Sequence, residues 1–216
     1  MKTIYCISGL GADERAFSKL KILPGYRLQV LPWLKPLPAE TIGEYAERMS
    51  KAIDEKEPLL LGLSFGGIMC TEIAKLLPVH KIIIISSIKT SGELPAWMKT
   101  VGLLKLNKIV PLRSTRLSAP FQNRFLGVSN SEDLAVAQSY RKNADINYVK
   151  WAVDKVVNWK NNWVHPNTWH IHGDNDKMFP IKKIRANYTL KDGGHFMIMN
   201  KAAEVSGFVN HILLTT

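Results

Sequence analysis

The sequence is poor in cysteine and in long apolar runs. Only Cys6 and Cys70 occur in 216 residues, which is too few for a disulfide scaffold, and no Cys-x-x-Cys pair is present for metal or redox chemistry. No stretch approaches the roughly 18 apolar residues that cross a bilayer. The N-terminal MKTIYCISGLGAD holds no apolar stretch of signal-peptide length. We therefore expect two reduced, buried thiols in a cytoplasmic protein without a membrane span.

Acidic residues are scarce relative to basic ones, 18 against 29, so the formal net charge is +11. Such a charge attracts anions at long range. The lysines are nevertheless dispersed, and the densest basic cluster, Lys182, Lys183 and Arg185, is short. No helix-turn-helix, RNP motif or basic run with stacked aromatics is present. We expect no nucleic-acid partner and interpret the charge as a solvated surface; the alternative is that it steers an anionic ligand.

Short apolar segments alternate with segments of helical periodicity along the chain. Strands that are apolar throughout and alternate with helices are typical of a parallel sheet covered on both faces. A length of 216 residues suits one such α/β domain. Thr41, with Glu44 three residues later, predicts a capping box at the start of one helix. Strands are predicted at residues 3–8, 27–31, 59–63, 81–86, 168–172 and 185–190, and helices at residues 13–20, 41–56, 66–77, 146–159 and 202–213.

About 80 residues between the fourth and fifth predicted strands do not follow this alternation, and an insertion of that length in a compact domain is usually functional or disordered. The segment is helical in pieces and contains many aromatic residues, which argues against disorder. We expect residues 88–160 to form a helical cap on a single domain of residues 1–216, and this cap to shape an apolar acyl pocket. Trp33 follows the second predicted strand, and an exposed ring beside Pro32 is the alternative for it. The candidate pocket residues are Trp33, Trp97, Phe121 and Phe125.

The five residues Gly62-Leu63-Ser64-Phe65-Gly66 lie between a predicted apolar strand and a predicted helix. A turn this sharp forces its central residue into a strained backbone conformation and exposes its side chain, so the flanking residues must be very small. A serine at a helix N-terminus is also well placed for developing negative charge. The alternative is a turn in which Ser64 caps the helix. The position between strand and helix favours Ser64 as a nucleophile.

A serine nucleophile needs a base, and the base needs a carboxylate to orient it. Among the six histidines, His195 stands in a loop directly after Gly193-Gly194, from which it can reach over the sheet edge. We interpret His172, at a predicted strand end, as structural. Two aspartates follow that strand. We favour Asp176, which lies further into the loop; Asp174 is nearer the strand end and suited to capping the turn, and an Asp-rich turn held by its own hydrogen bonds is the alternative for both.

The segment Gly9-Leu10-Gly11 follows the first predicted strand and offers backbone N–H groups to an oxyanion. The N–H of Phe65, next to the serine, is a second such donor. A dinucleotide fingerprint is excluded because position 14 is Glu14 instead of the third glycine. These segments all fall at carboxyl ends of predicted parallel strands, the edge at which open α/β sheets place their sites.

Together with the chain order Ser, Asp, His, these motifs resemble the α/β-hydrolase superfamily over nearly the whole chain outside the cap. The resemblance implies a three-layer α/β fold with about six mostly parallel strands and helices on both faces. It also implies a nucleophile elbow at Ser64, an oxyanion hole made by the N–H groups of Leu10 and Phe65, and a triad completed by Asp176 and His195. The sequence departs from the pattern at Ser8, where many members have histidine, and lacks the family's N-terminal antiparallel strands.

These residues predict a serine hydrolase that cleaves a small to medium carboxylic ester through a Ser64 acyl-enzyme. Its partner is a small-molecule acyl substrate, and no metal or organic cofactor is required. One alternative is an acyl thioesterase, since the anionic coenzyme A or carrier protein would give the net charge a purpose. Another is a ligand-binding receptor with negligible turnover. Similar folds also host lyases and cofactor-free oxygenases, so the fold by itself does not decide the reaction, and no oligomeric state is predicted.

Overall fold

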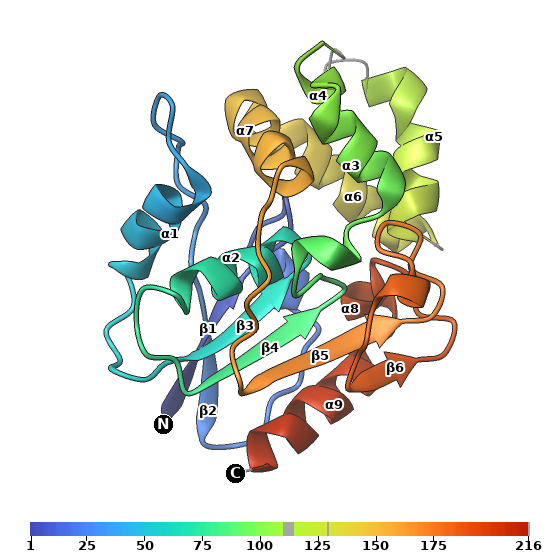
Figure 1. Cartoon of the computed structure of the whole chain (residues 1–216). Helices are drawn as coiled ribbons and strands as arrows, with labels where there is room; N and C mark the ends of the chain where they lie inside the picture. Colours follow the sequence, from blue (N-terminus) through green and yellow to red (C-terminus); the bar gives the residue numbers. More distant parts are fainter. Residues whose placement is uncertain (110–114, 129, 216) are drawn as a thin grey trace.

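A single six-stranded sheet forms the centre of the computed structural model, which describes residues 1–109, 115–128 and 130–215 (Figure 1). The strands are ordered β2-β1-β3-β4-β5-β6, and every neighbouring pair is parallel. A wholly parallel sheet needs cover on both faces. The strands are β1 (Lys2–Ile7), β2 (Tyr26–Val30), β3 (Leu59–Leu63), β4 (Lys81–Ile85), β5 (Thr168–Gly173) and β6 (Tyr188–Leu190).

Helices cover both faces of the sheet, and each face has its own apolar cluster. Helices α1 (Ile42–Ser50) and α2 (Phe65–Ile73) pack on one face, and α9 (Ala202–Leu214) with the short α8 (Met197–Asn200) packs on the other. Every residue of the central strands β3 and β4 is buried between them. This is the α/β fold that the continuously apolar strands predict, and the free, buried Cys6 agrees with the expectation of reduced thiols, as does Cys70.

Several elements are shorter than their sequence pattern predicts. The capping box of Thr41 and Glu44 is present, but α1 ends at Ser50 because residues 52 and 53 close tight turns with i→i−3 hydrogen bonds. Residues 13–20 hold only a 3₁₀ turn, η1 (Glu14–Phe17). The prediction for residues 66–77 overshoots α2, and only the last three residues of 185–190 pair as β6.

The chain between β4 and β5 is helical. Figure 1 shows these helices gathered over one end of the sheet, at the opposite end from both chain termini. We call residues 88–160 the cap. Its elements are η2 (Ser91–Glu93), α3 (Ala96–Leu103), α4 (Leu106–Ile109), α5 (Thr115–Leu126), α6 (Ser131–Asn143) and α7 (Ile146–Val157).

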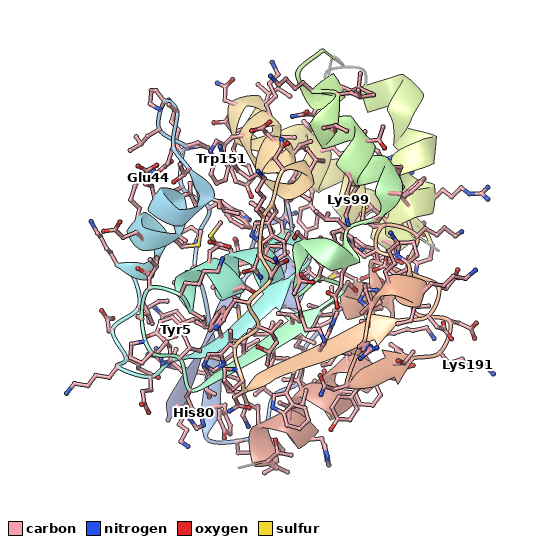
Figure 2. The ribbon with its side chains drawn as sticks, viewed as in Figure 1. Tyr5, Glu44, His80, Lys99, Trp151 and Lys191 are labelled. Atoms are coloured by element: carbon pink, nitrogen blue, oxygen red, sulfur yellow. The ribbon has the colours of Figure 1, made fainter. Side chains whose placement is uncertain are left out.

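Helix α7 is fixed to the sheet side by aromatic residues. Trp151 points toward α1 (Figure 2), where its ring lies 4.3 Å from that of Tyr45 and its Nε1 donates to the Glu40 carbonyl oxygen at 3.0 Å. At the other end, Trp159 Nε1 donates to the buried Glu72 carboxylate of α2 at 2.8 Å. Buried tryptophans with paired N–H groups are strong anchors, so α7 holds the cap in place. Within the described ranges, no helix is long and apolar enough to cross a membrane.

Candidate active site

Ser64 lies at the sharp turn between β3 and α2, with φ 52° and ψ −117°. A positive φ is rare for a residue other than glycine and is costly unless the surroundings hold it. Here the Ser64 N–H donates to the Ile85 carbonyl oxygen at 2.9 Å, and its own carbonyl oxygen accepts from Ser87 Oγ at 2.6 Å. The Ser64 hydroxyl makes no capping bond to α2, so the capping interpretation is wrong. The side chain is left available for other contacts.

The glycines around Ser64 are required by close backbone contacts. A Cβ on Gly62 would lie 2.5 Å from the Gly66 carbonyl oxygen. A Cβ on Gly66 would overlap the backbone of Ile7 at the end of β1, and one on Gly67 would overlap Ser87. Strand and helix therefore approach each other as closely as the pattern of glycines around the serine predicts.

The loops after β5 and β6 bring two further side chains to Ser64. His195 Nε2 lies 2.8 Å from Ser64 Oγ, and His195 Nδ1 lies 2.8 Å from Asp176 Oδ2. Because an ionised carboxylate only accepts, Nδ1 carries the hydrogen and Nε2 is free to accept from the serine hydroxyl. All three side chains lie at carboxyl ends of parallel strands, and His195 and Asp176 are buried.

Asp176, and not Asp174, reaches His195. The Asp174 residue is exposed, and its N–H donates to the Leu190 carbonyl oxygen at 3.1 Å. Asp176 Oδ1 accepts from the N–H groups of Met178 at 2.8 Å and Phe179 at 2.9 Å, so both carboxylate oxygens are bound. Burial raises the pKa of Asp176. The charge of His195, its hydrogen bond to Asp176 and the hydrogen bond from the Phe179 N–H lower the pKa by more, so the pKa lies below its ordinary value. The carboxylate is therefore held ionised.

Two buried histidines stand behind Asp176. His172 Nε2 donates to the Phe179 carbonyl oxygen at 2.8 Å and lies 3.6 Å from Asp176 Oδ2. That leaves His172 Nδ1 to accept from His170 Nε2 at 3.2 Å. Burial lowers the pKa of both histidines, so both are neutral. His172 thus supports the loop that carries Asp176. Positions 170 and 172 lie two residues apart on β5 and therefore on the same face of the strand, which is the sequence pattern from which the contact between the two histidines could have been predicted.

The loop after β1 lies directly beside Ser64. A Cβ on Gly9 would be 3.6 Å from Ser64 Cβ. Ser8 Oγ donates to the Ala12 carbonyl oxygen at 2.8 Å, and Trp33 Nε1 donates to Ser8 Oγ at 2.9 Å. Ser8 and Trp33 thus support the loop at the position where many α/β-hydrolases use histidine. This places Leu10, within the loop, near the turn.

The N–H of Phe65 belongs to the first turn of α2, and such N–H groups have no acceptor within the helix. The Phe65 ring stacks on Trp33, with ring centroids 5.2 Å apart and an interplanar angle of 15°. The Trp33 ring also packs against the ring of Tyr148 of α7, with the ring centroids 5.2 Å apart. Its ring is therefore partly buried between the turn and the cap, so the alternative of an exposed ring beside Pro32 is wrong.

The other three candidate pocket residues, Trp97, Phe121 and Phe125, belong to helices α3 and α5 of the cap. Trp97 is 47% exposed, and its ring lies 5.9 Å from that of Phe125, edge to face. The side chain of Phe121 lies outside what the structure describes.

A cavity of about 460 Å³ opens elsewhere, between the start of α1, Glu72 of α2 and Trp159, and the triad does not line it. Among the described residues, no group of three or more His, Cys, Asp or Glu side chains is arranged to hold a metal ion.

The cap also contacts the histidine loop. The Phe196 N–H donates to the Leu126 carbonyl oxygen at the end of α5, at 2.8 Å. The neighbouring Gly127 has φ 71°, and a Cβ there would lie 3.2 Å from Gly194 Cα. The backbone of the cap is thus in direct contact with the residue before His195.

No protein-family model matches the chain, and a search of the curated proteins finds no match either. Solved structures do resemble it. A thermophilic esterase from Thermogutta terrifontis superposes with a TM-score of 0.78 at 14% identity, covering 99% of this chain and 89% of that one. A bromoperoxidase from Bacillus anthracis gives 0.69 at 14% identity, covering 99% and 92%. A meta-cleavage product hydrolase from Pseudomonas fluorescens gives 0.68 at 15% identity, covering 99% and 90%.

Proposed function

The chain has the α/β-hydrolase fold, and from the site that this fold carries we propose that it is a serine hydrolase of small to medium carboxylic esters. The observation that supports the proposal most directly is the continuous hydrogen-bonded series from Ser64 through His195 to Asp176, at 2.8 Å for each step. The esterase and the hydrolase among the similar structures are compatible with this chemistry, and the bromoperoxidase shows that the same fold also carries other reactions. Their low identity limits that likeness to the fold.

In the proposed reaction, Ser64 Oγ attacks the ester carbonyl carbon while His195 Nε2 takes the hydroxyl proton. The carbonyl oxygen becomes an oxyanion, which the N–H groups of Leu10 and Phe65 stabilise. The protonated His195 is held in its tautomer by Asp176 and returns the proton to the departing alcohol. Water then attacks the acyl-enzyme by the same route, releases the acid and restores the serine.

A thioester is the second candidate substrate. The same acyl-enzyme chemistry cleaves a thioester, and only the leaving group differs. The net charge of +11 favours this candidate, because coenzyme A and acyl-carrier proteins are anionic and would be attracted at long range. Comparing 4-nitrophenyl esters with acyl-coenzyme A substrates of equal chain length, at low and high salt, would decide between the two.

The proposal is tested by intact-mass analysis after reaction with a fluorophosphonate. We expect the wild-type protein to take up one label per chain and Ser64→Ala to take up none. Ser18→Ala, which changes an exposed serine away from the site, is the matched control and should be labelled like the wild type. A folded wild-type protein that resists labelling would contradict an activated nucleophile and favour a receptor without turnover.

A further inference from the structure

Arg141 is a partly buried cation whose Nη atoms pair with no carboxylate among the described residues. It lies in the last turn of α6, and both of its Nη atoms are buried with no hydrogen-bond partner among the described residues. Burial without a partner lowers its pKa, but a guanidinium stays protonated in proteins. An unpaired buried charge is strongly unfavourable. This arrangement therefore points to an anion that the protein itself does not supply.

The other well-placed arginines of the chain show the contrast. Arg15 donates to both carboxylate oxygens of Asp13, with its closest contact at 2.6 Å, and Arg48 donates to the buried Glu40 at 2.6 Å. Both pairs are partly exposed to solvent, where pairing matters least. Of these three arginines, Arg141 is the one whose Nη atoms are buried and have no acceptor among the described residues.

Arg141 is close in the sequence to Ala144, the residue at which the cap contacts the proposed oxyanion loop. Three residues after it, Ala144 is the C-cap of α6, and a Cβ on Gly11 would lie 3.6 Å from Ala144 Cβ. Gly11 directly follows Leu10, the proposed oxyanion donor. Arg141 therefore lies within one helical turn of the residue through which the cap touches the proposed oxyanion loop.

A second donor without an acceptor, the Tyr148 hydroxyl, follows Ala144 by four residues in the chain. The ring of Tyr148 packs against Trp33, the residue is 5% exposed, and its buried hydroxyl finds no acceptor in the described part of the chain. Burial raises the pKa of this hydroxyl strongly, while a contact from the backbone N–H of Gly11 lowers it, so the oxygen lies beside the same loop. Each buried donor without an acceptor costs stability, so two such donors, before and after Ala144 in the chain, indicate a ligand rich in acceptors.

We propose that Arg141 binds a carboxylate on the acyl part of the substrate, with the Tyr148 hydroxyl as a second donor. The inference rests on the proposed ester hydrolysis at Ser64 and names its substrate class, the monoesters of dicarboxylic acids. A planar guanidinium matches a carboxylate with two parallel hydrogen bonds. A single cation balances one negative charge, which suits a carboxylate better than a doubly charged phosphate. The net charge of +11 would draw such substrates to the protein.

The test compares matched 4-nitrophenyl esters: the hexanoate with the adipate monoester, and the octanoate with the suberate monoester. The members of each pair have equal chain lengths and differ only in the terminal carboxylate. We expect a higher kcat/KM for the carboxylate member in the wild type, and a loss of that preference in Arg141→Met by roughly 10- to 100-fold. The neutral member should react almost as before, and Arg141→Lys should keep part of the preference. Equal rates for both members in the wild type, or an equal loss for both in the variant, would overturn the proposal.

Thermal unfolding separates this inference from the proposed reaction. Free adipate should raise the Tm of the wild type but not of Arg141→Met, and neutral dimethyl adipate should shift neither. Arg141→Met should itself unfold at an equal or higher temperature, since an apolar side chain replaces an unpaired charge; a clear decrease would reveal a structural partner and overturn the site. If Ser64 proves unreactive, the adipate shift still decides whether the carboxylate site exists. Stabilisation by inorganic phosphate without any by adipate would contradict the choice of a carboxylate.

Discussion

At the carboxyl edge of the sheet, every side-chain polar atom of Ser64, His195 and Asp176 has a partner, whereas in the cap the Nη atoms of Arg141 and the hydroxyl hydrogen of Tyr148 have no acceptor among the described residues. The two regions thus satisfy their buried polar groups differently. A reacting group has to be aligned before the substrate arrives, because reorganising it during the reaction would raise the barrier. A recognition group can wait for the ligand to complete it. The difference agrees with the two proposals, in which the sheet edge serves the reaction and the cap selects the substrate.

The largest test of this comparison removes the charge at the sheet edge. Asp176→Asn should lower kcat by about 10⁴-fold, since the amide favours the wrong His195 tautomer and no longer stabilises its charged form. Asp174→Asn is the matched control and should retain activity close to wild type, because the Asp174 side chain is exposed. The rates are measured on one 4-nitrophenyl ester. A larger loss in Asp174→Asn, with both variants folded, would reverse the assignment of the acid.

The second test asks how closely the sheet edge is packed. Gly66→Ala should destabilise the fold by about 3 kcal/mol or more, because the new Cβ would overlap the backbone of Ile7 and neither strand nor helix can move freely. Gly207→Ala, on the exposed side of α9 with nothing within 4 Å, should instead stabilise by roughly 0.5–1 kcal/mol. Urea unfolding measures both. Equal stability of the two variants would mean that the elbow has room to adjust.

The third test uses the histidines behind Asp176. Burial lowers the pKa of His170 and His172 from 6.5, so below that pH the unfolded chain binds protons that the folded chain does not. The free energy of unfolding should therefore be fully retained above about pH 6.5 and decrease as the pH falls toward the folded pKa values, by up to about 1.4 kcal/mol per pH unit for each histidine. Asp176 does not contribute in this range, because its carboxylate is ionised in both states.

The variant His170→Leu should reduce that slope by up to one half. Unfolding in urea at about pH 7 and about pH 5.5 gives the two free energies. A slope that is unchanged in the variant would show that His170 is protonated in the folded state, against the burial seen here.

The smallest effect is expected at Trp33, which lies between the carboxyl edge of the sheet and the cap. Trp33→Phe keeps the ring against Tyr148 and Phe65 but removes the Nε1–H that supports Ser8, so the oxyanion loop should loosen and kcat should decrease by about tenfold. Trp163→Phe, at a 41% exposed position, is the control. A change in KM alone would instead assign Trp33 to the substrate pocket.

The features that could be predicted from the sequence are local. The strands follow from apolar runs such as the four isoleucines of β4, and the elbow follows from the glycines on both sides of Ser64, whose necessity is steric. The order of serine, aspartate and histidine then limits which loops meet at the sheet edge. Helix 41–56 was predicted too long because its periodic residues continue to Ile53, past the end of α1 at Ser50, and a pattern does not show where the chain must turn.

The supporting contacts could not be predicted, because they join residues that only the tertiary fold brings together. Trp33 and Ser8 belong to loops after different strands, and no local pattern links an indole N–H to a serine hydroxyl. The lack of a partner at Arg141 is likewise a property of the packed cap, where a solvated arginine and a buried one look the same in the sequence.

The hydrogen bond from Phe196 to Leu126 has a consequence for protein engineering. For a capped hydrolase of the kind proposed here, an obvious way to change the substrate preference is to replace one cap by another. Here the cap carries part of the backbone that supports the proposed catalytic histidine, and a Cβ on Gly194 would lie 3.3 Å from Gly127 Cα, so the two segments pack closely. A graft that begins before Leu126 would need to restore this junction, so selectivity and turnover cannot evolve as independent traits across it.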